Sequence, residues 1–420
     1  MTQDGTPLFK VFYGWYILAA AFLICTLGHG VQFSFGVFLK PLSETFAWSR
    51  SLTVIAFMLY VICRGISGTL TGHLTDRYGP RAIVAIGGIL MGVGMTLGAV
   101  ANQIWELYLF YGVLAGLGMG VVTVPLSATL SRWFIAWRGL AQGILVAGSG
   151  FGNLVFAPVA GYLILNFGLK KAFLLIGTGV LVLISLFSLV LRKEPADMQL
   201  KPYGAAGEHA KGSQADQLEK QDTTEEAWEI SRVLRTTSFW LLAAIAFIFG
   251  VCLYTTTSNI VAYATDMGIS RAMAPYLLSI AGASDLVGIL VWSLVTEKIG
   301  ARQALVICLG LQTLAMFGLA WASSLPLFCL SAAVFGFCYG GIALEILVIT
   351  PEFFGMKSLG SITGLVFFIH LIGGAVGSVL GNLVYDFTAS HSYGGAFLLI
   401  GAASIVSVIA AVVMRKPRPI

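Results

Sequence analysis

The chain alternates between long apolar stretches and short polar connections. The apolar stretches are about twenty residues long, which is the length that an α-helix needs to cross the hydrocarbon core of a membrane. Twelve such stretches follow one another, so the pattern predicts twelve transmembrane helices. The predicted spans are 14–38, 50–72, 82–101, 104–128, 139–165, 172–192, 237–263, 272–296, 303–322, 325–349, 359–385 and 393–414.

One connection is longer and more polar than the others. Residues 193–236 carry a cluster of acidic side chains between Asp216 and Glu229. We therefore expect a six-helix bundle at 1–192, a cytoplasmic linker loop at 193–236, and a second six-helix bundle at 237–420. The end of the linker, from Glu225 to Arg235, mixes apolar and charged side chains. This pattern fits either a short helix on the membrane surface or a disordered tether.

A charged turn occurs once in each predicted bundle. Residues 72–81 read Gly-His-Leu-Thr-Asp-Arg-Tyr-Gly-Pro-Arg, and residues 293–302 keep the acid, the base, the glycine and the arginine in order. The offset is constant at 221 residues, since 297 − 76, 298 − 77, 300 − 79 and 302 − 81 agree. The duplication predicts an all-α membrane fold of two pseudo-symmetric six-helix bundles, related by a two-fold axis along the membrane normal. Substrate then binds between the bundles, near the membrane midplane.

Composition agrees with a membrane protein and excludes several other classes. With 58% hydrophobic and 10% charged residues and a mean hydropathy of +0.90, the chain is too apolar for a soluble globular protein. The net charge of +5 is spread over short loops, so we expect no nucleic-acid partner. The six cysteines lie in apolar stretches without CxxC spacing, and the chain has no GxxxxGK loop or nucleophile–base constellation. We therefore expect no enzyme activity, no cofactor and no metal site.

Lysine and arginine are distributed unevenly between the two sides of the predicted membrane. With the N-terminus in the cytoplasm, the basic residues on the opposite side are Lys40, Arg50, Lys170, Lys171 and Arg271. Apart from Arg64, which lies inside a span, all the others fall on the cytoplasmic side. Because cytoplasmic loops are enriched in these residues, we expect a multi-pass protein of the cytoplasmic membrane with both termini in the cytoplasm.

The stretch 72–81 resembles the signature that the major facilitator superfamily carries between its second and third helices. The resemblance implies the two-bundle fold predicted above and a gate at the cytoplasmic side. An aspartate here can pair with cations at helix ends, and the arginines can bond exposed carbonyls. The candidate gating residues are Asp76, Arg77, Arg81, Glu297, Lys298 and Arg302. The alternative is that these charges only fix the topology of a tight turn.

A narrower resemblance covers most of the chain. Several motifs look like those of the bacterial monocarboxylate transporter and oxalate/formate antiporter group. They are Tyr13-Gly14-Trp15, Ser34 to Phe38, Trp48-Ser49-Arg50, Trp133-Phe134, Arg138-Gly139, Phe239-Trp240 and Val261 to Ser270. The resemblance implies a secondary transporter of small carboxylates, coupled to protons or to anion exchange.

The sequence departs from that group in one important place. The group often carries a glycine–arginine pair in its eighth helix, whose arginine binds the substrate carboxylate, but this chain has Gly288-Ile289. A second basic residue of the antiporters, in the eleventh helix, corresponds roughly to His370. The usual monocarboxylate substrate is therefore an open question.

Charged side chains inside a span are costly, by about 3 kcal/mol at the bilayer centre, and so mark functional positions. Arg64 and Asp285 occupy equivalent places in the repeat, since 285 − 64 is again 221. We expect Arg64 to bind the substrate carboxylate through two parallel N–H groups, with Asp285 as its competing partner in the empty site. The alternative is a permanent structural ion pair, or pairing of the charges with backbone carbonyls. Glu345 lies near the cytoplasmic edge, where we expect it to reach water.

Two histidines lie near the middle of their predicted helices. His29 and His370 titrate in the range where a transported proton is exchanged, so both are candidates for proton coupling, as is Asp285. The alternative is a neutral imidazole that hydrogen-bonds between helices.

Polar and aromatic side chains supply candidates for the wall of the binding cavity. The seventh span carries the run Tyr254-Thr-Thr-Thr-Ser-Asn259, in which hydroxyls can bond their own helix or face water. We expect Tyr254 and Asn259 in the cavity wall, together with Tyr60 and Tyr339, for which packing is the alternative.

Glycines of the fifth predicted span indicate close packing against a helix of the other bundle. This span carries Gly143, Gly148, Gly150, Gly152 and Gly161, with a bend at Pro158, and Gly143 matches Gly364 at the repeat offset of 221. Such glycines permit either a static contact or a seam that rocks during transport.

These observations predict a secondary active transporter that works by alternating access. We expect it to move a small, monocarboxylate-like organic anion coupled to a proton or exchanged for a counter-anion. We expect a monomer in the lipid bilayer. The alternatives are a transporter of neutral or hydroxylated solutes, or a transporter-like sensor that binds without translocating.

Overall fold

The computed structural model describes residues 12–204, 230–355, 359–389 and 391–417. Within these residues, twelve helical segments are long and apolar enough to cross a membrane, as the hydrophobic pattern predicts. The first half contains α1 (Tyr13–Phe46), α2 (Arg50–Tyr78), α3 (Pro80–Leu97), a fourth span made of α4 (Ile104–Leu107), the π-helix η1 (Tyr108–Ala115) and α5 (Gly116–Trp133), then α6 (Arg138–Phe167) and α7 (Leu169–Ser188). The second half contains α10 (Thr237–Asp266), α11 (Tyr276–Ile299), α12 (Ala301–Ala320), α13 (Leu325–Phe354), α14 (Leu359–Phe387) and α15 (Gly394–Val413).

The helices extend beyond the predicted apolar spans. The first predicted span ends at Phe38, but α1 continues through Pro41 to Phe46. The apolar stretch measures the thickness of the hydrocarbon layer, whereas the helix continues into the polar region, where its backbone hydrogen bonds remain intact. Only the membrane-embedded part of each helix is therefore visible in the hydrophobic pattern.

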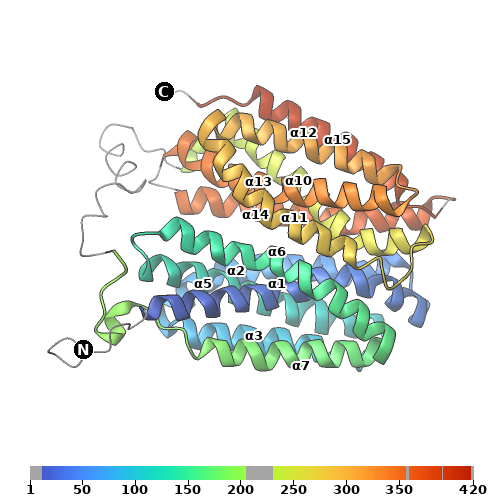
Figure 1. The fold of residues 1–420 in the computed structure, drawn as a ribbon, viewed down its shortest axis with the longest axis horizontal. Coiled ribbons are helices and arrows are strands. Elements are labelled where there is room, and N and C mark those ends of the chain that lie inside the picture. The colour runs from blue at the N-terminus through green and yellow to red at the C-terminus, as the bar shows by residue number, and fades with distance from the viewer. Residues whose placement is uncertain (1–11, 205–229, 356–358, 390, 418–420) are drawn as a thin grey trace, which may run out of the picture.

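The two halves have the same internal packing. In the first half, α1 packs against α6, α2 against α5, and α3 against α7. In the second half, α10 packs against α14, α11 against α13, and α12 against α15, which is the same pattern one repeat later. Figure 1 shows the two halves as separate layers, with α1–α7 below and α10–α15 above. The structural repeat that the duplicated charged turn predicts is therefore present in the packing of the helices.

Two short helices border the linker. The 3₁₀-helix η2 (Pro195–Met198) follows α7, and α9 (Ile230–Val233) precedes α10. The predicted surface segment from Glu225 to Arg235 lies partly outside the described residues. The described part includes α9, where Val233 is buried. The boundaries of the three predicted parts, 1–192, 193–236 and 237–420, stay a prediction.

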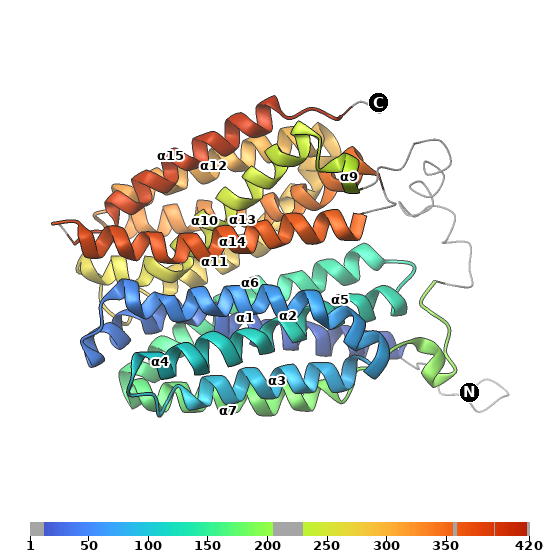
Figure 2. The same cartoon turned by 180° about the vertical axis from the view of Figure 1, so that it is seen from behind.

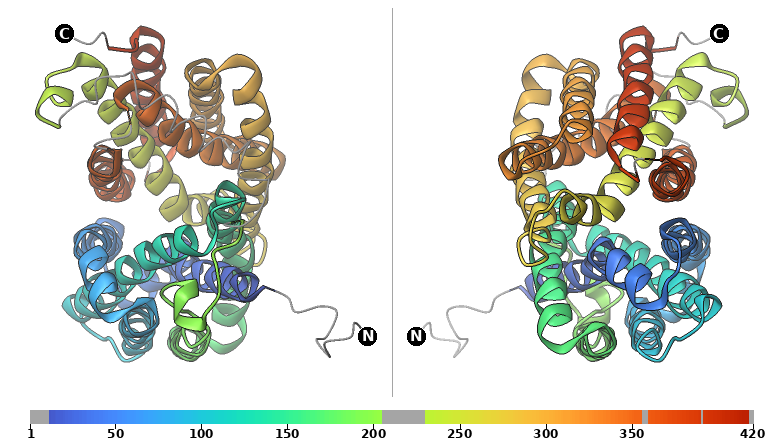
Figure 3. Two further views of the ribbon diagram at one scale, coloured as in Figure 1. Left: turned by 90° about the vertical axis from the view of Figure 1, so that its left-hand side faces the viewer. Right: turned by 90° about the vertical axis from the view of Figure 1, so that its right-hand side faces the viewer.

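The bundle has two distinct ends. At the termini end, α1 begins and α15 finishes, and at the distal end α1 finishes at Phe46 and α10 at Asp266 (Figure 1). The halves meet where α1 contacts α10, α2 contacts α14, and α6 contacts α11. Figure 2 shows α14 running beside the first half, and Figure 3 looks along the bundle from both ends.

The hydrophobic core shows where the halves are joined. One continuous core contains the first half together with the distal part of the second half, including Val251 of α10 and Leu371 of α14. The termini-end part of the second half forms a separate core, which includes Phe249 and Val366. The halves therefore share a core at the distal end but not at the termini end.

Candidate functional site

Arg64 lies in the middle of α2 and is only 9% exposed. Its Nη1 donates a hydrogen bond to Oε1 of Gln32 at 2.5 Å, and its Nη2 lies 3.4 Å from Nε2 of His29. A guanidinium can only donate, so Nε2 of His29 accepts, and Nδ1 carries the hydrogen that reaches the carbonyl of Cys25 at 3.1 Å. His29 is thus held as a neutral imidazole, which favours the hydrogen-bonding alternative over proton coupling.

The guanidinium of Arg64 has only neutral neighbours. Its two hydrogen-bond partners are an amide and an imidazole, and the ring of Phe367 lies 6.0 Å from its Cζ atom. Among the described residues, no carboxylate forms an ion pair with it. A buried charge without a counter-ion is unfavourable, so this site is electrostatically suited to an anion.

The position of Arg64 depends on close packing of α2 against the fourth span. A Cβ atom added to Gly120 of α5 would lie 2.2 Å from the carbonyl oxygen of Arg64. Any larger residue would push the two helices apart. Glycine at this position therefore allows α5 to approach α2 closely at the level of Arg64.

Side chains of the second half complete the surroundings of Arg64. The hydroxyl of Tyr254 accepts a hydrogen bond from Nε2 of Gln32 at 3.4 Å, which joins α10 to α1. His370 of α14 donates from Nδ1 to the carbonyl of Ala246 at 3.2 Å, and its ring centroid lies 5.9 Å from that of Tyr254. We call His29, Gln32, Arg64, Tyr254 and His370 the central cluster. Gln32 was not predicted, because a single glutamine in an apolar stretch carries no distinctive pattern.

Two predicted wall residues lie in aromatic packing. Tyr60 is fully buried and stacks on Tyr111 at 5.2 Å, and its hydroxyl has no hydrogen-bond partner within the described chain. Tyr339 packs against Phe249, with ring centroids 5.7 Å apart. Both positions agree with the packing alternative.

Asp285 is buried at 2% exposure and is not paired with Arg64, so the expected pairing is absent in this conformation. Neither of its carboxylate oxygens has a hydrogen-bond partner in the part of the chain that the structure describes. The carboxylate lies between the halves, where Cβ atoms added to Gly150 and Gly340 would come within 2.8 and 2.5 Å of its oxygens. The repeat places the two charges at equivalent depths, but Arg64 points towards α1 and Asp285 towards α6 and α13.

Glu345 differs from the prediction. The sequence predicts contact with water near the cytoplasmic edge, but Glu345 is fully buried and accepts a hydrogen bond from the hydroxyl of Thr296. The bond joins α13 to α11, and the cost of burial is partly offset by this partner. Glu345 therefore has a structural contact inside the second half.

The hydroxyl run of α10 is used for packing. Thr257 and Ser258 bond carbonyls of their own helix at 2.9 and 2.6 Å, and Thr255 bonds the carbonyl of Gly377 at 2.7 Å. Asn259, expected in the cavity wall, instead accepts a hydrogen bond from Asn382 at 2.7 Å. The run therefore joins α10 to α14, and Asn259 belongs to a network at the distal end.

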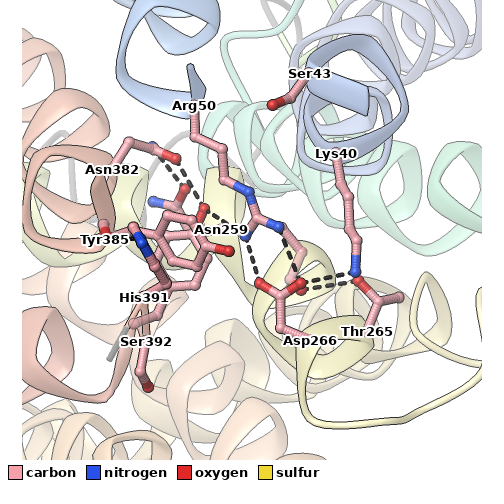
Figure 4. A network of polar contacts seen from close by, with 12 residues as sticks. Lys40, Ser43, Arg50, Asn259, Thr265, Asp266, Asn382, Tyr385, His391 and Ser392 are labelled. Carbon is pink, nitrogen blue, oxygen red and sulfur yellow. Dashed lines mark hydrogen bonds and ion pairs between the residues drawn. The ribbon is translucent and has the colours of Figure 1, made fainter. Parts of the chain in front are cut away.

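That distal network bridges the two halves (Figure 4). Arg50 of α2 donates from both terminal nitrogens to the carboxylate of Asp266, with the Nη2–Oδ1 distance at 2.9 Å. Lys40 of α1 reaches Oδ1 of the same carboxylate at 2.7 Å. Arg50 also donates to Tyr393 at 3.2 Å, and Tyr393 donates to Asn382 at 2.9 Å. One carboxylate of the second half thus holds two cations of the first half.

Two sequence motifs that lie far apart along the chain meet in this network. Arg50 closes the motif Trp48-Ser49-Arg50, and Asp266 lies in the stretch from Val261 to Ser270. Both stretches carry the narrower family resemblance, and the fold brings them into contact. From the sequence alone, Lys40 and Arg50 indicate only the orientation of the chain in the membrane.

The candidate gating residues lie at the termini end. Arg77 and Arg81 are exposed, with Cζ of Arg77 5.3 Å from the ring of Tyr78, and Glu297 and Lys298 are exposed as well. Arg302 bonds the carbonyls of Ala411 and Val412 at the end of α15. The side chain of Asp76 lies outside the described part of the structure. A role of these residues in closing the termini end stays a prediction.

A family model described as Major Facilitator Superfamily matches residues 18–288 and 260–420. The chain belongs to this superfamily. It is therefore a multi-pass membrane protein of the transporter class, and its named relatives are transporters rather than enzymes. The narrower resemblance agrees with the curated relatives, which include monocarboxylate transporters 11 to 13.

These relatives align along nearly the whole chain. Monocarboxylate transporter 12 of Rattus norvegicus is 28% identical over 418 residues, which cover 94% of this chain and 84% of the relative. Monocarboxylate transporter 13 of Rattus norvegicus is 28% identical over 404 residues, covering 94% and 89%. Monocarboxylate transporter 11 of Homo sapiens is 28% identical over 412 residues, covering 93% and 82%.

Solved structures share the fold at low sequence identity. A mutant form of the nucleoside transporter NupG has a TM-score of 0.71 at 15% identity, covering 96% of this chain and all of that structure. A bacterial homologue of the human lysosomal transporter Spinster has a TM-score of 0.69 at 14% identity, covering 97% and 96%.

Proposed function

We propose that the chain is a secondary active transporter of a small organic anion that carries a carboxylate. The observation that carries this proposal is the buried guanidinium of Arg64, whose hydrogen-bond partners among the described residues are the neutral side chains of Gln32 and His29. A carboxylate can replace both neutral acceptors at once, with two parallel N–H···O bonds. The 28% identity to monocarboxylate transporters supports the same substrate class.

The geometry of Arg64 also explains how the site works without the arginine expected in α11. Arg64 comes from the first half, whereas the missing position, Ile289, lies in the second half. The central cluster still draws on both halves, because Tyr254 and His370 come from α10 and α14. An anion bound at Arg64 thus contacts both halves, as alternating access requires.

Proton coupling is assigned to Asp285 and His370. Asp285 is a buried carboxyl without a hydrogen-bond partner in the described residues, so its ionised form is costly and taking up a proton removes that cost. His370 uses Nδ1 for the carbonyl of Ala246, which leaves Nε2 to accept a proton. Exchange for a counter-anion is the alternative mode. In this mode the two anions bind in turn at Arg64, and no proton is carried.

We assign the closed distal end to the outer side of the cell membrane. The excess of Lys and Arg on the side of the termini supports this orientation, with both termini cytoplasmic. The conformation is then inward-facing: the distal network closes the outside, while the halves share no core at the termini end. We take the functional unit to be a monomer.

The second candidate function is transport of a neutral or hydroxylated solute. The observation in its favour is Ile289 in place of an α11 arginine, which leaves the site with one cation. The hydroxyls of Thr255, Thr257 and Ser258 in α10 do not strengthen this candidate, because they bond backbone carbonyls. A sensor that binds without translocating would show saturable binding without flux.

Uptake into proteoliposomes tests the proposal. Arg64→Gln removes the charge and the paired donors, and we expect uptake of a panel of small carboxylates to fall roughly 10- to 100-fold, as for one or two charge-assisted hydrogen bonds. Arg64→Lys keeps the charge and should retain part of the activity. The matched control is Lys170→Gln at the surface of α7, where Lys170 bonds only Asn102 among the described residues. Carboxylate uptake by Arg64→Gln at the level of the control would rule out the anchor.

A further inference from the structure

A cavity lies at the distal end, away from the central cluster. It has a volume of about 330 Å³, which is at the lower end of the range for small-molecule sites. Its walls come from α1 and α6 of the first half and from α10 and the α10–α11 connection of the second half. The residues that the argument uses are Val37, Lys40, Glu44, Ile164, Val261 and Arg271. No residue of the central cluster lines this distal cavity, and Val37 is five residues, or about 7.5 Å, from Gln32 along α1.

The distal cavity combines an apolar interior with a charged rim. Val37 and Val261 are buried, and Ile164 is half-buried beside them. The rim carries Lys40 and Arg271 against one lining carboxylate, Glu44. The rim therefore has an excess of positive charge, and the interior beneath it is apolar.

The anions near the rim are already engaged. Glu44 pairs with Arg271 at 2.8 Å, in an exposed contact with side-chain exposures of 42% and 59%. Lys40 pairs with Asp266, which also holds Arg50. Because one carboxylate serves two cations, an added anion at the rim improves the charge balance.

We propose that the distal cavity binds an amphiphilic carboxylate with a medium-length alkyl chain. The carboxylate sits at the rim between Lys40 and Arg271, and the alkyl chain lies on Val37, Ile164 and Val261. The occupant touches both halves, so it stabilises the closed distal end and slows the return to the outward-open form. This inference rests on the alternating access of the proposed function, but it assigns a separate, inhibitory site.

Binding of radiolabelled octanoate to the full chain in lipid nanodiscs tests the proposal, with 1-octanol as the uncharged probe of equal length. Ile164→Trp fills the cavity, and we expect octanoate affinity to fall roughly tenfold, since each displaced methylene costs about fourfold. Tyr162→Trp adds the same ring on the same helix at a residue that does not line the cavity, and should leave affinity unchanged. Arg271→Gln should weaken octanoate binding about three- to fivefold, as for an exposed charge, and leave octanol binding unaffected.

The variant Arg64→Gln separates the two sites. We expect it to keep the octanoate binding that Ile164→Trp loses, and we expect octanoate to lower the maximal uptake rate of the wild type without raising KM. If octanoate binding instead disappears in Arg64→Gln and survives in Ile164→Trp, the site is the central cluster and the proposal is wrong. Absence of saturable binding to the wild type also overturns it. If Arg64→Gln transports normally while Ile164→Trp loses octanoate, the proposed function fails and the distal cavity stands.

Discussion

Asp266→Asn removes the charge on which the distal network depends. The carboxylate holds Arg50 and Lys40 across the interface, and the side-chain exposures are 20% for Asp266, 9% for Arg50 and 16% for Lys40. A hydrogen bond to a charged group is worth roughly 1.5–3 kcal/mol when buried and clearly less when exposed to water. For these partly exposed contacts together we expect about 2 kcal/mol, which shifts the equilibrium away from the distal-closed form roughly 30-fold.

Spin-label distance measurements detect this shift directly. One label pair, Lys171 and Ala389, spans the halves at the distal end, and a second pair, Leu140 and Ser361, spans them at the termini end. All four positions are exposed, so labels there replace no core contact. In a background without the six native cysteines, Asp266→Asn should lengthen the distal distances and shorten those at the termini end.

A matched control and a double-mutant cycle test whether the contact between Arg50 and Asp266 holds the distal end closed. Arg271→Gln removes the exposed pair with Glu44, which we expect to shift the equilibrium less than threefold. Arg50→Gln and Asp266→Asn should be non-additive, because they remove the same contact. If Asp266→Asn leaves both distance distributions within the range of Arg271→Gln, the distal network does not hold the outside closed.

Four further variants address proton coupling and the rocking of the two halves. Asp285→Asn should abolish accumulation driven by a pH gradient while leaving substrate exchange intact, and pH-driven accumulation at the wild-type level would exclude Asp285 as a proton carrier. His370→Gln should lower pH-driven uptake about tenfold or more if Nε2 carries the proton, measured at fixed substrate gradient. Gly143→Leu and Gly364→Leu place bulk where a Cβ atom added to the glycine would meet no other part of the described structure within 4 Å, so both should fold normally. Both variants should raise the fraction of the distal-closed form in the spin-label experiment. Distance distributions equal to those of the wild type would show that these glycines do not pack closely in the distal-open form.

The fold could be predicted almost completely from the sequence. A buried polar backbone must satisfy its hydrogen bonds within each segment, so an apolar stretch of about twenty residues has few alternatives to a membrane helix. The constant offset between Asp76 and Glu297 then fixed the repeat, and the packing of α2 against α5 and of α11 against α13 follows it. The ends of helices such as α1 could not be predicted, because helices continue beyond the hydrocarbon layer.

The candidate site could be predicted only in part, because an offset gives depth but not direction. Arg64 and Asp285 are equivalent in the repeat, but each side chain turns to the nearest space left by its own helix neighbours. For Arg64 that space contains Gln32, and for Asp285 it lies beside Gly340. Such contacts depend on packing angles between helices, which no single stretch of sequence contains.

The helix α10 connects the central cluster to the distal network. It carries Tyr254 at the centre and Asp266 at its end, 12 residues or about 18 Å further along (266 − 254). The helix α10 is continuous between Tyr254 and Asp266. The end of α2 can therefore separate from Asp266 while the middle of α2 stays close to Tyr254. In the proposed mechanism the centre acts as the pivot of the rocking motion, so that Arg64 stays within reach of the second half in both states. A carboxylate held there would stay bound while the two ends open in turn, which is the requirement that alternating access places on a substrate site.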